Sequence, residues 1–268
     1  MPRRDATIGL VTGFDLGEFG RAGVVALRGA FTRDEADAMK AAIWRRVESQ
    51  TTARRDDPST WCDVALPSFK PLKRRGVFAP AIHNAELAGA LDGIFGRGAW
   101  APSGSGVQVL MTFPNATSWT LPHHLWHTDA GFGRVTPTTM VKVFCCVDDV
   151  RQGGGGTLAL AGSHRLVDRD AREGSEGPRP GNSAAWRRFL SRDGWTRDLI
   201  NPGAEPARSR RLLGEPAEID GIEVGVVEMT GAPGDVFVTD IHTFHCVAPN
   251  ALDRPRMMLG VVFSRAEA

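Results

Sequence analysis

The spacing of apolar residues in the first hundred positions predicts one short strand and two helices. Within residues 19–31 a β-branched core is bounded by glycines, which is typical of a short strand. Thr32 stands three residues before Glu35, the spacing of a capping box, and apolar residues then recur at helical spacing to about Ser49. A second helix is expected over residues 83–95, and we expect both helices to pack outside the strands that follow.

From about residue 105 the pattern changes to short apolar runs separated by turn signals. Such a series predicts a β-sandwich or jelly roll, so the expected fold is mainly β with flanking helices, of the double-stranded β-helix (jelly-roll, cupin-like) type. One domain is expected over residues 1–268, with the N-terminal strand and helices in 15–100 and the jelly-roll core in 105–264. The expected strands are residues 106–113, 138–147, 156–161, 222–229, 235–239 and 257–264.

Two long stretches lack a regular apolar pattern. Residues 50–80 are rich in Pro and Arg with isolated aromatic residues, and we expect a long ordered loop there. Residues 165–220 are polar and rich in Arg, Pro, Gly and Ser around a short predicted helix near 184–191. So long an irregular segment inside a compact domain is usually a functional lid or a disordered insert, and we expect a lid insert over 165–220.

Composition narrows the class of protein. The chain has 268 residues, 42% of them hydrophobic, which is enough for a substantial core, and its formal net charge of +1 gives no reason to expect a nucleic-acid or membrane partner. The four cysteines form no C-x-x-C pair, which fits reduced thiols in the cytosol. No apolar run is long enough for a signal peptide or a membrane span, so a cytoplasmic protein with a small-molecule substrate is expected, its oligomeric state left open.

The candidate chemistry lies in an H-x-D motif, His127-Thr128-Asp129, and in a histidine far downstream. On an extended strand residues i and i+2 point to the same side, so His127 and Asp129 can hold one ion. Together with His245 they are the two imidazoles and one carboxylate that bind non-haem Fe(II) and leave positions open for other ligands. A zinc site would more often draw on cysteines. His242 is the alternative to His245.

Four blocks of the sequence, in the same order, resemble the phytanoyl-CoA dioxygenase family of Fe(II)/2-oxoglutarate-dependent oxygenases. Residues 19–39 resemble its opening strand and helix, and residues 125–129 are similar to its metal-binding W-H-x-D. Residues 155–165, ending in Ala-Gly-Ser-His-Arg, resemble a strand and a "PGSHR" turn. Residues 234–263 resemble the closing block, in which a Gly-Asp strand leads to H-x-x-x-x-N and then D-R-P-R.

The resemblance implies roles for residues of that closing block. His245 precedes a stretch that matches the turn after the family's second histidine ligand, which favours it over His242. Arg256, eleven residues after His245, falls where the family's arginine anchors the distal carboxylate of 2-oxoglutarate, an end that a planar guanidinium binds bidentately. Arg254 is the alternative, because strand alternation is expected to put both arginines on one face.

The remaining candidates are polar and aromatic residues near these motifs. The family often carries a lysine or glutamine in the strand before the metal motif, and Lys142 lies on the next strand along the chain. Ser163 and His164 are expected to complete a structural turn, not to bind metal. The expected co-substrate contacts besides Arg256 are Gln108, Thr112 and Thr157. The expected substrate contacts are Trp126, Lys142 and Trp61.

The activity that the resemblance implies is that of a dioxygenase using Fe(II), 2-oxoglutarate and O2 to oxidise an unactivated C–H of a small metabolite or natural-product intermediate, with release of succinate and CO2. The chemistry takes place at iron, so no side chain is expected to act as a general base. Related radical halogenases replace the carboxylate ligand by a small residue; Asp129 therefore favours hydroxylation, desaturation or ring-forming oxidation. The alternatives are a metal-dependent hydrolase or isomerase on a jelly-roll barrel and a non-catalytic binding module.

Overall fold

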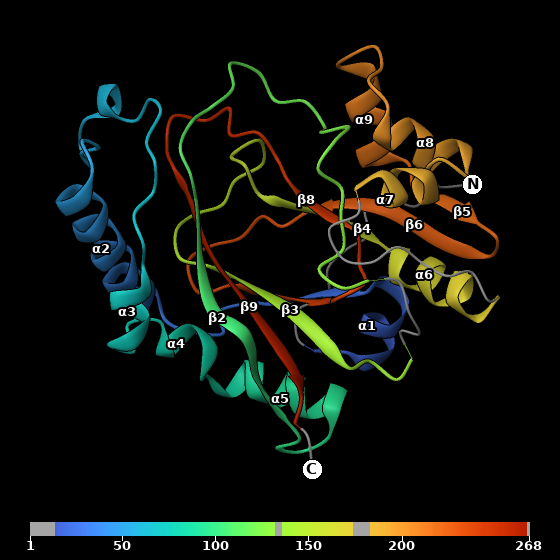
Figure 1. Ribbon diagram of the computed structural model, residues 1–268, viewed down its shortest axis with the longest axis horizontal. Coiled ribbons are helices and arrows are strands. Elements are labelled where there is room, and N and C mark those ends of the chain that lie inside the picture. The colour runs from blue at the N-terminus through green and yellow to red at the C-terminus, as the bar shows by residue number, and fades with distance from the viewer. Residues whose placement is uncertain (1–13, 132–135, 174–182, 267–268) are drawn as a thin grey trace, which may run out of the picture.

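Two antiparallel sheets form the centre of the protein, which a computed structural model describes for residues 14–131, 136–173 and 183–266 (Figure 1). The larger sheet has the order β1-β7-β3-β9-β2, with bounds β1 Val24–Leu27, β2 Trp100–Thr112, β3 Met140–Cys146, β7 Val236–Asp240 and β9 Arg256–Arg265. The smaller sheet has the order β5-β6-β4-β8, with bounds β4 Thr157–Ala161, β5 Ala217–Ile219, β6 Ile222–Glu228 and β8 His245–Val247.

The helices lie outside the sheets (Figure 1), and along the chain they form two groups. The N-terminal group is α1 Leu16–Ala22, α2 Arg33–Gln50, the 3-10 helix η1 Pro58–Thr60, α3 Lys70–Arg74, α4 Ala79–Ile82 and α5 Ala85–Phe95. The second group, beside the smaller sheet, is α6 Ser163–Arg172, α7 Ser183–Leu190, α8 Gly194–Ile200 and α9 Ala207–Gly214. Among the described helices, none is long and apolar enough to cross a membrane.

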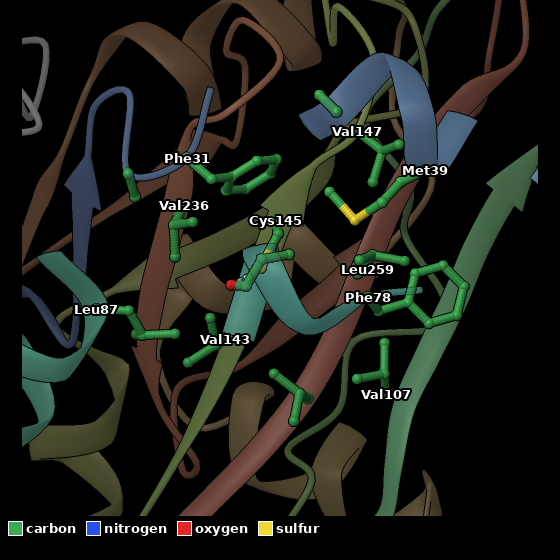
Figure 2. Close-up of a cluster of buried hydrophobic side chains, with 14 of the residues drawn as sticks. Phe31, Met39, Phe78, Leu87, Val107, Val143, Cys145, Val147, Val236 and Leu259 are labelled. Carbon is green, nitrogen blue, oxygen red and sulfur yellow. Dashed lines mark hydrogen bonds between the residues drawn. The ribbon is translucent and has the colours of Figure 1, made fainter. Parts of the chain in front are cut away.

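Strand alternation divides the apolar side chains among three cores. On β3, Val143 and Cys145 point to the helix side, where they pack with α2 and α5 in the cluster drawn in Figure 2. Phe144 and Cys146 point the other way and meet side chains of the smaller sheet in a core between the two sheets. The outer face of the smaller sheet packs against α6–α9 in a third cluster. The inner faces of the two sheets therefore face each other across this core.

The elements with strong local signals agree with their predictions. The capping box is present, since Thr32 Oγ1 accepts from Glu35 N at 3.2 Å and Thr32 N donates to Glu35 Oε2 at 2.8 Å. The predicted helix over 83–95 is α5, with Asn84 as its N-cap. All six predicted strands exist, although β2 begins earlier than expected, before an irregularity between Ser103 and Gln108.

Other elements were predicted wrongly. Residues 19–22 end helix α1 and do not begin the strand, and the expected loop over 50–80 contains η1, α3 and α4. The helix predicted near 184–191 is confirmed as α7, but the rest of the segment 165–220, expected to be irregular, holds most of α6 together with α8, α9 and β5, with residues 174–182 outside the described part. That this segment acts as a lid stays a prediction. These helices are polar on most sides, and each buries a few apolar residues such as Leu166, Trp186 and Leu212 against the smaller sheet. The three-residue strands β5 and β8 were not predicted.

Candidate metal and co-substrate site

His127, Asp129 and His245 are brought together by pairing between segments that are far apart in the sequence. His127 and His245 form an isolated antiparallel bridge, and their rings lie 4.4 Å apart between centroids. Asp129 Oδ2 lies 3.5 Å from Nε2 of His245. One ligand atom from each residue lies within 4.8 Å of the others, so small side-chain rotations would let all three bind one ion at bond lengths of about 2.1 Å.

Backbone carbonyls fix the orientation of both rings. Nδ1 of His127 lies 2.7 Å from Leu125 O, and Nδ1 of His245 lies 3.0 Å from Thr243 O. Because a carbonyl can only accept, each Nδ1 carries a hydrogen, and in a neutral ring of this tautomer Nε2 keeps its lone pair for a metal. Burial, and next the neighbouring His127, lower the pKa of His245 to about 4, so this ring is neutral at pH 7. The pair is therefore prepared to bind a cation.

The donor set fits Fe(II) and contains no thiolate. Burial raises the pKa of Cys145 to about 12 and raises those of Cys146 and Cys246 further, so these thiols stay protonated. None of the described cysteines belongs to the cluster. Two imidazoles and a carboxylate suit iron in a site with open positions. His242, the alternative ligand, lies 3.2 Å from Asp240 through its Nδ1 and is not part of the cluster.

Arg256 is a buried cation that lacks a carboxylate partner among the described residues. Its Nη2 donates to Thr112 Oγ1 at 2.6 Å and its Nη1 lies 3.6 Å from Met258 Sδ. Its Nε is buried and has no hydrogen-bond partner in the described part of the chain. Burial lowers the pKa of Arg256 to about 10, which still leaves it protonated at neutral pH. An unpaired buried charge is costly, so the site fits an anionic group such as the distal carboxylate of 2-oxoglutarate.

Arg254 occupies a different environment from Arg256. It lies in the turn before β9, so the expected strand alternation does not apply to it. Its side chain is 43% exposed and its Nε lies 3.9 Å from Asp253 Oδ1. Of the two arginines, Arg256 is therefore the one placed to bind an anion inside the protein.

The other predicted co-substrate residues also lie on the inner faces of the sheets. Gln108 Oε1 accepts from Lys142 Nζ at 3.4 Å, and Lys142 Nζ lies 3.4 Å from Asp129 Oδ2, so both residues adjoin the metal cluster. Thr112 adjoins Arg256, as its hydrogen bond shows. Thr157 is buried on β4 opposite Val247, two residues after His245. The inner surface thus carries polar groups at both of its ends.

The structure places two predicted substrate contacts elsewhere. Trp126 is buried in the outer core of the smaller sheet, where its Nε1 donates to Pro122 O at 2.9 Å. Trp61 packs at 6.1 Å from the Trp44 ring in the helix-side core. Trp186 of α7 instead lies 5.8 Å from the ring of His127, a contact that sequence reasoning did not assign. The sequence does place Trp186 four residues before Leu190, a spacing that predicts one buried helix face.

Gly162 and Ser163 support the segment that carries His245. Gly162 has φ +80°, and an added Cβ would lie 2.1 Å from Glu223 O, so only glycine fits this turn. Ser163 Oγ accepts from Phe244 N at 2.9 Å, directly before His245. His164 points away from the cluster, with Nε2 3.1 Å from Gly20 O, and burial lowers its pKa. Ser163 and His164, expected to complete a turn, are instead the first residues of α6, and Ser163 supports the segment of a candidate metal ligand.

Leu125 shows strain beside the metal cluster that sequence reasoning missed. It has φ +71°, which is uncommon for a leucine, and its side chain is 55% exposed. This conformation accompanies the orientation of its carbonyl toward His127 Nδ1. No pattern in the sequence signals it, because glycine and asparagine are the residues usually found in this conformation.

The chain is similar to one protein family and to several solved structures. A family model described as phytanoyl-CoA dioxygenase (PhyH) matches residues 19–258. Among solved structures, EvdO2 from Micromonospora carbonacea var. aurantiaca is 18% identical over 97% of this chain and 95% of that chain, with TM-score 0.51. The non-heme alpha ketoglutarate dependent carbocyclase SnoK from nogalamycin biosynthesis is 18% identical over 93% of this chain and 82% of that chain, with TM-score 0.52. The epimerase SnoN in complex with Fe3+, alpha ketoglutarate and nogalamycin RO is 20% identical over 92% of this chain and 80% of that chain, with TM-score 0.48. No curated protein matches the sequence.

Proposed function

Because the chain belongs to the phytanoyl-CoA dioxygenase family, we propose that it oxidises an unactivated C–H bond of a small metabolite or natural-product intermediate. Fe(II) is the cofactor, and 2-oxoglutarate and O2 are the co-substrates, as in the family. One observation carries the proposal for this chain: the cluster of two histidines and Asp129 shares an inner surface with Arg256, a buried cation lacking a carboxylate partner in the described residues. We take the two sheets as halves of one jelly-roll domain.

Each residue of the site has a separate task. His127, Asp129 and His245 hold the metal and leave its other positions open. Arg256, oriented by Thr112, binds the distal carboxylate of 2-oxoglutarate. When bound, Fe(II) with 2-oxoglutarate and O2 supplies an oxidant that removes a hydrogen atom from a C–H bond, with succinate and CO2 as the co-products. The apolar core between the sheets keeps water away from the reacting atoms.

Hydroxylation is the outcome that we propose, with desaturation or ring-forming oxidation as alternatives on the same site. Asp129 fills the position that a halide would need in a halogenase of this type, so halogenation is disfavoured. The rival hydrolase needs a general base beside the metal. In the described part of the chain, Asp129 is the one carboxylate of the cluster, and it is committed to the ion. Hydrolysis also needs no anionic co-substrate, so a hydrolase would give no reason for the buried cation at Arg256.

An anaerobic titration with Fe(II) and 2-oxoglutarate tests the proposal. We expect the visible charge-transfer band of a keto acid chelated to Fe(II), and we expect it to be absent in Asp129→Ala. Loss of an outer partner of a metal ligand costs about 10–100-fold in affinity, so loss of a ligand itself should cost more. Asp253→Ala, at a side chain that is 94% exposed, is the matched control and should keep the band. Iron binding without a band in the wild-type protein would favour the hydrolase.

A further inference from the structure

Lys142 places a nearly buried ammonium beside the candidate metal. It is 8% exposed on the inner face of β3, and its Nζ lies 3.4 Å from Asp129 Oδ2 and 5.9 Å from the centre of the Phe144 ring. Asp129 is the one carboxylate within ion-pair distance of Lys142 in the described part of the chain. The amide oxygen of Gln108, at 3.4 Å, is a neutral partner. The charge of Lys142 thus depends on a carboxylate that also serves the metal.

The charges of the proposed complex do not balance at Lys142. On the proposed function, Asp129 and the keto-acid carboxylate of 2-oxoglutarate neutralise Fe(II), and the distal carboxylate neutralises Arg256. The positive charge of Lys142 then remains without an anion in a largely buried position, where an unpaired charge is unfavourable. A further negative group is needed beside the metal, and substrate is the component of the reaction still to be placed there.

The position of Lys142 on the sheet agrees with a substrate contact. In the strand register Arg256 pairs with Thr112, whereas Lys142 pairs with Val262, six residues further along β9, or about 20 Å at the usual strand rise. The end at Arg256 is buried, whereas Gln108 and Val262 at the other end are partly open to solvent. Lys142 therefore lies at the end from which a substrate would approach the metal.

Gly260 makes room for this lysine. A Cβ at Gly260 would lie 3.3 Å from Lys142 Cε and 3.2 Å from Leu110 Cδ1, so the missing side chain lets the lysine stem lie close to the strand. Gly260 is paired with Phe144 on the neighbouring strand, beneath the ammonium group. The lysine is therefore held along the inner surface, with its head directed to the metal cluster.

We propose that the substrate carries an anionic group, a carboxylate or a phosphate, that Lys142 binds beside the metal. A compact ammonium with three donors suits such a group. The proposal names a substrate class for the same site and rests on the proposed function. Neutral substrates would leave the charge of Lys142 unpaired in the loaded enzyme.

The test uses small probes and measures binding without turnover. The anaerobic protein, loaded with Fe(II) and 2-oxoglutarate, is titrated with hexanoate, hexyl phosphate and the neutral hexanamide, and perturbation of the charge-transfer band gives each Kd. We expect at least one anion to bind about tenfold or more tightly than the amide, since hydrogen bonds to charged groups are the stronger ones. The preferred anion distinguishes carboxylate from phosphate. Equal binding of the anions and the amide, or binding of none, overturns the proposal.

Variants assign any preference to Lys142. In Lys142→Met the anion preference should fall to near unity while Fe(II) and 2-oxoglutarate still produce the band, and Lys142→Arg should restore the preference. Lys70→Met, at an exposed lysine of α3, is the matched control and should behave as wild type. Retained preference in Lys142→Met overturns the proposal, as does a tenfold loss of 2-oxoglutarate affinity with no effect on probe binding. Absence of the band in the wild-type protein would instead contradict the proposed function.

Discussion

His127 and His245 exchange two backbone hydrogen bonds, with N–O distances of 3.0 Å from His127 N to His245 O and 2.9 Å in the opposite direction. Residues that share both bonds of an antiparallel pair stand directly opposite each other, so their side chains leave the pair on the same side. The two imidazoles are therefore held together by main-chain pairing and do not depend on the metal to meet. We expect the apo protein to keep the geometry of this half of the site.

Arg256→Met should weaken 2-oxoglutarate binding and leave the apo protein as stable as before or more stable. Removing one partner of a buried charge pair costs about 2–5 kcal/mol in binding, which is more than about 30-fold in Kd. An unpaired buried guanidinium contributes little to stability, so its loss is tolerated without co-substrate. Anaerobic titration and thermal melts measure the two effects. Arg254→Met is the control, and an equal loss of affinity there would contradict the assignment.

Ser163→Ala should loosen the segment that carries His245. The substitution removes the hydroxyl that accepts from the buried N–H of Phe244, a loss that costs about 1–3 kcal/mol of unfolding free energy. Because His245 is the next residue, Fe(II) affinity should fall as well, although no ligand is lost. Urea denaturation and metal titration measure these changes. Ser191→Ala, which removes an exposed hydroxyl, is the control and should change neither quantity. If Ser163→Ala changes neither stability nor Fe(II) affinity, the hydrogen bond between Ser163 and Phe244 does not support His245.

Leu125→Asn should stabilise the protein although it removes a leucine. The left-handed conformation at φ +71° costs a leucine roughly 1–2 kcal/mol, and asparagine adopts it more readily. Little burial is lost, since the side chain is 55% exposed. We expect a gain of about 0.5–1 kcal/mol in thermal or urea unfolding. Leu66→Asn, at an exposed leucine outside the positive-φ set, is the control. A gain of the same size at Leu66 would contradict the strain argument.

Glu228→Gln should stabilise the protein at alkaline pH and have little effect under acidic conditions. Burial raises the pKa of Glu228 to about 7, above its ordinary 4.5, although Gly153 N donates to it. The folded state therefore favours the protonated carboxyl. Its stabilising contribution is fully present below about pH 4.5 and is lost as pH rises through 7. Since one pKa unit corresponds to about 1.4 kcal/mol, the gain at pH 8 should be at most about 3 kcal/mol.

Urea unfolding of wild type and Glu228→Gln at pH 5 and pH 8 measures this difference. Glu218→Gln, at an exposed residue of β5, is the matched control and should change the free energy of unfolding by the same small amount at both pH values. A stability difference between wild type and Glu228→Gln that does not change with pH would mean that the carboxyl is ionised in the folded protein throughout.

The sequence by itself determined the features whose causes lie within a few residues. The capping box of Thr32 and Glu35 acts between residues three apart, and the alternation along β3 separates its helix side from its inner side by residue parity. The H-x-D spacing likewise puts His127 and Asp129 in reach of one ion. The family resemblance added the expected partner His245, and the resemblance itself is confirmed by the family match over residues 19–258.

Only the tertiary structure decided which of several similar residues face the site. His245 pairs with His127 while His242 pairs with Asp240, and Arg256 is buried against Thr112 while Arg254 is left in an open turn. Burial and strand pairing join residues far apart in the chain, so their free energy depends on the packing of the whole fold and not on local spacing. The same reason explains the helices α6–α9, whose polar sequences fold as helices because a few apolar residues in each meet the smaller sheet.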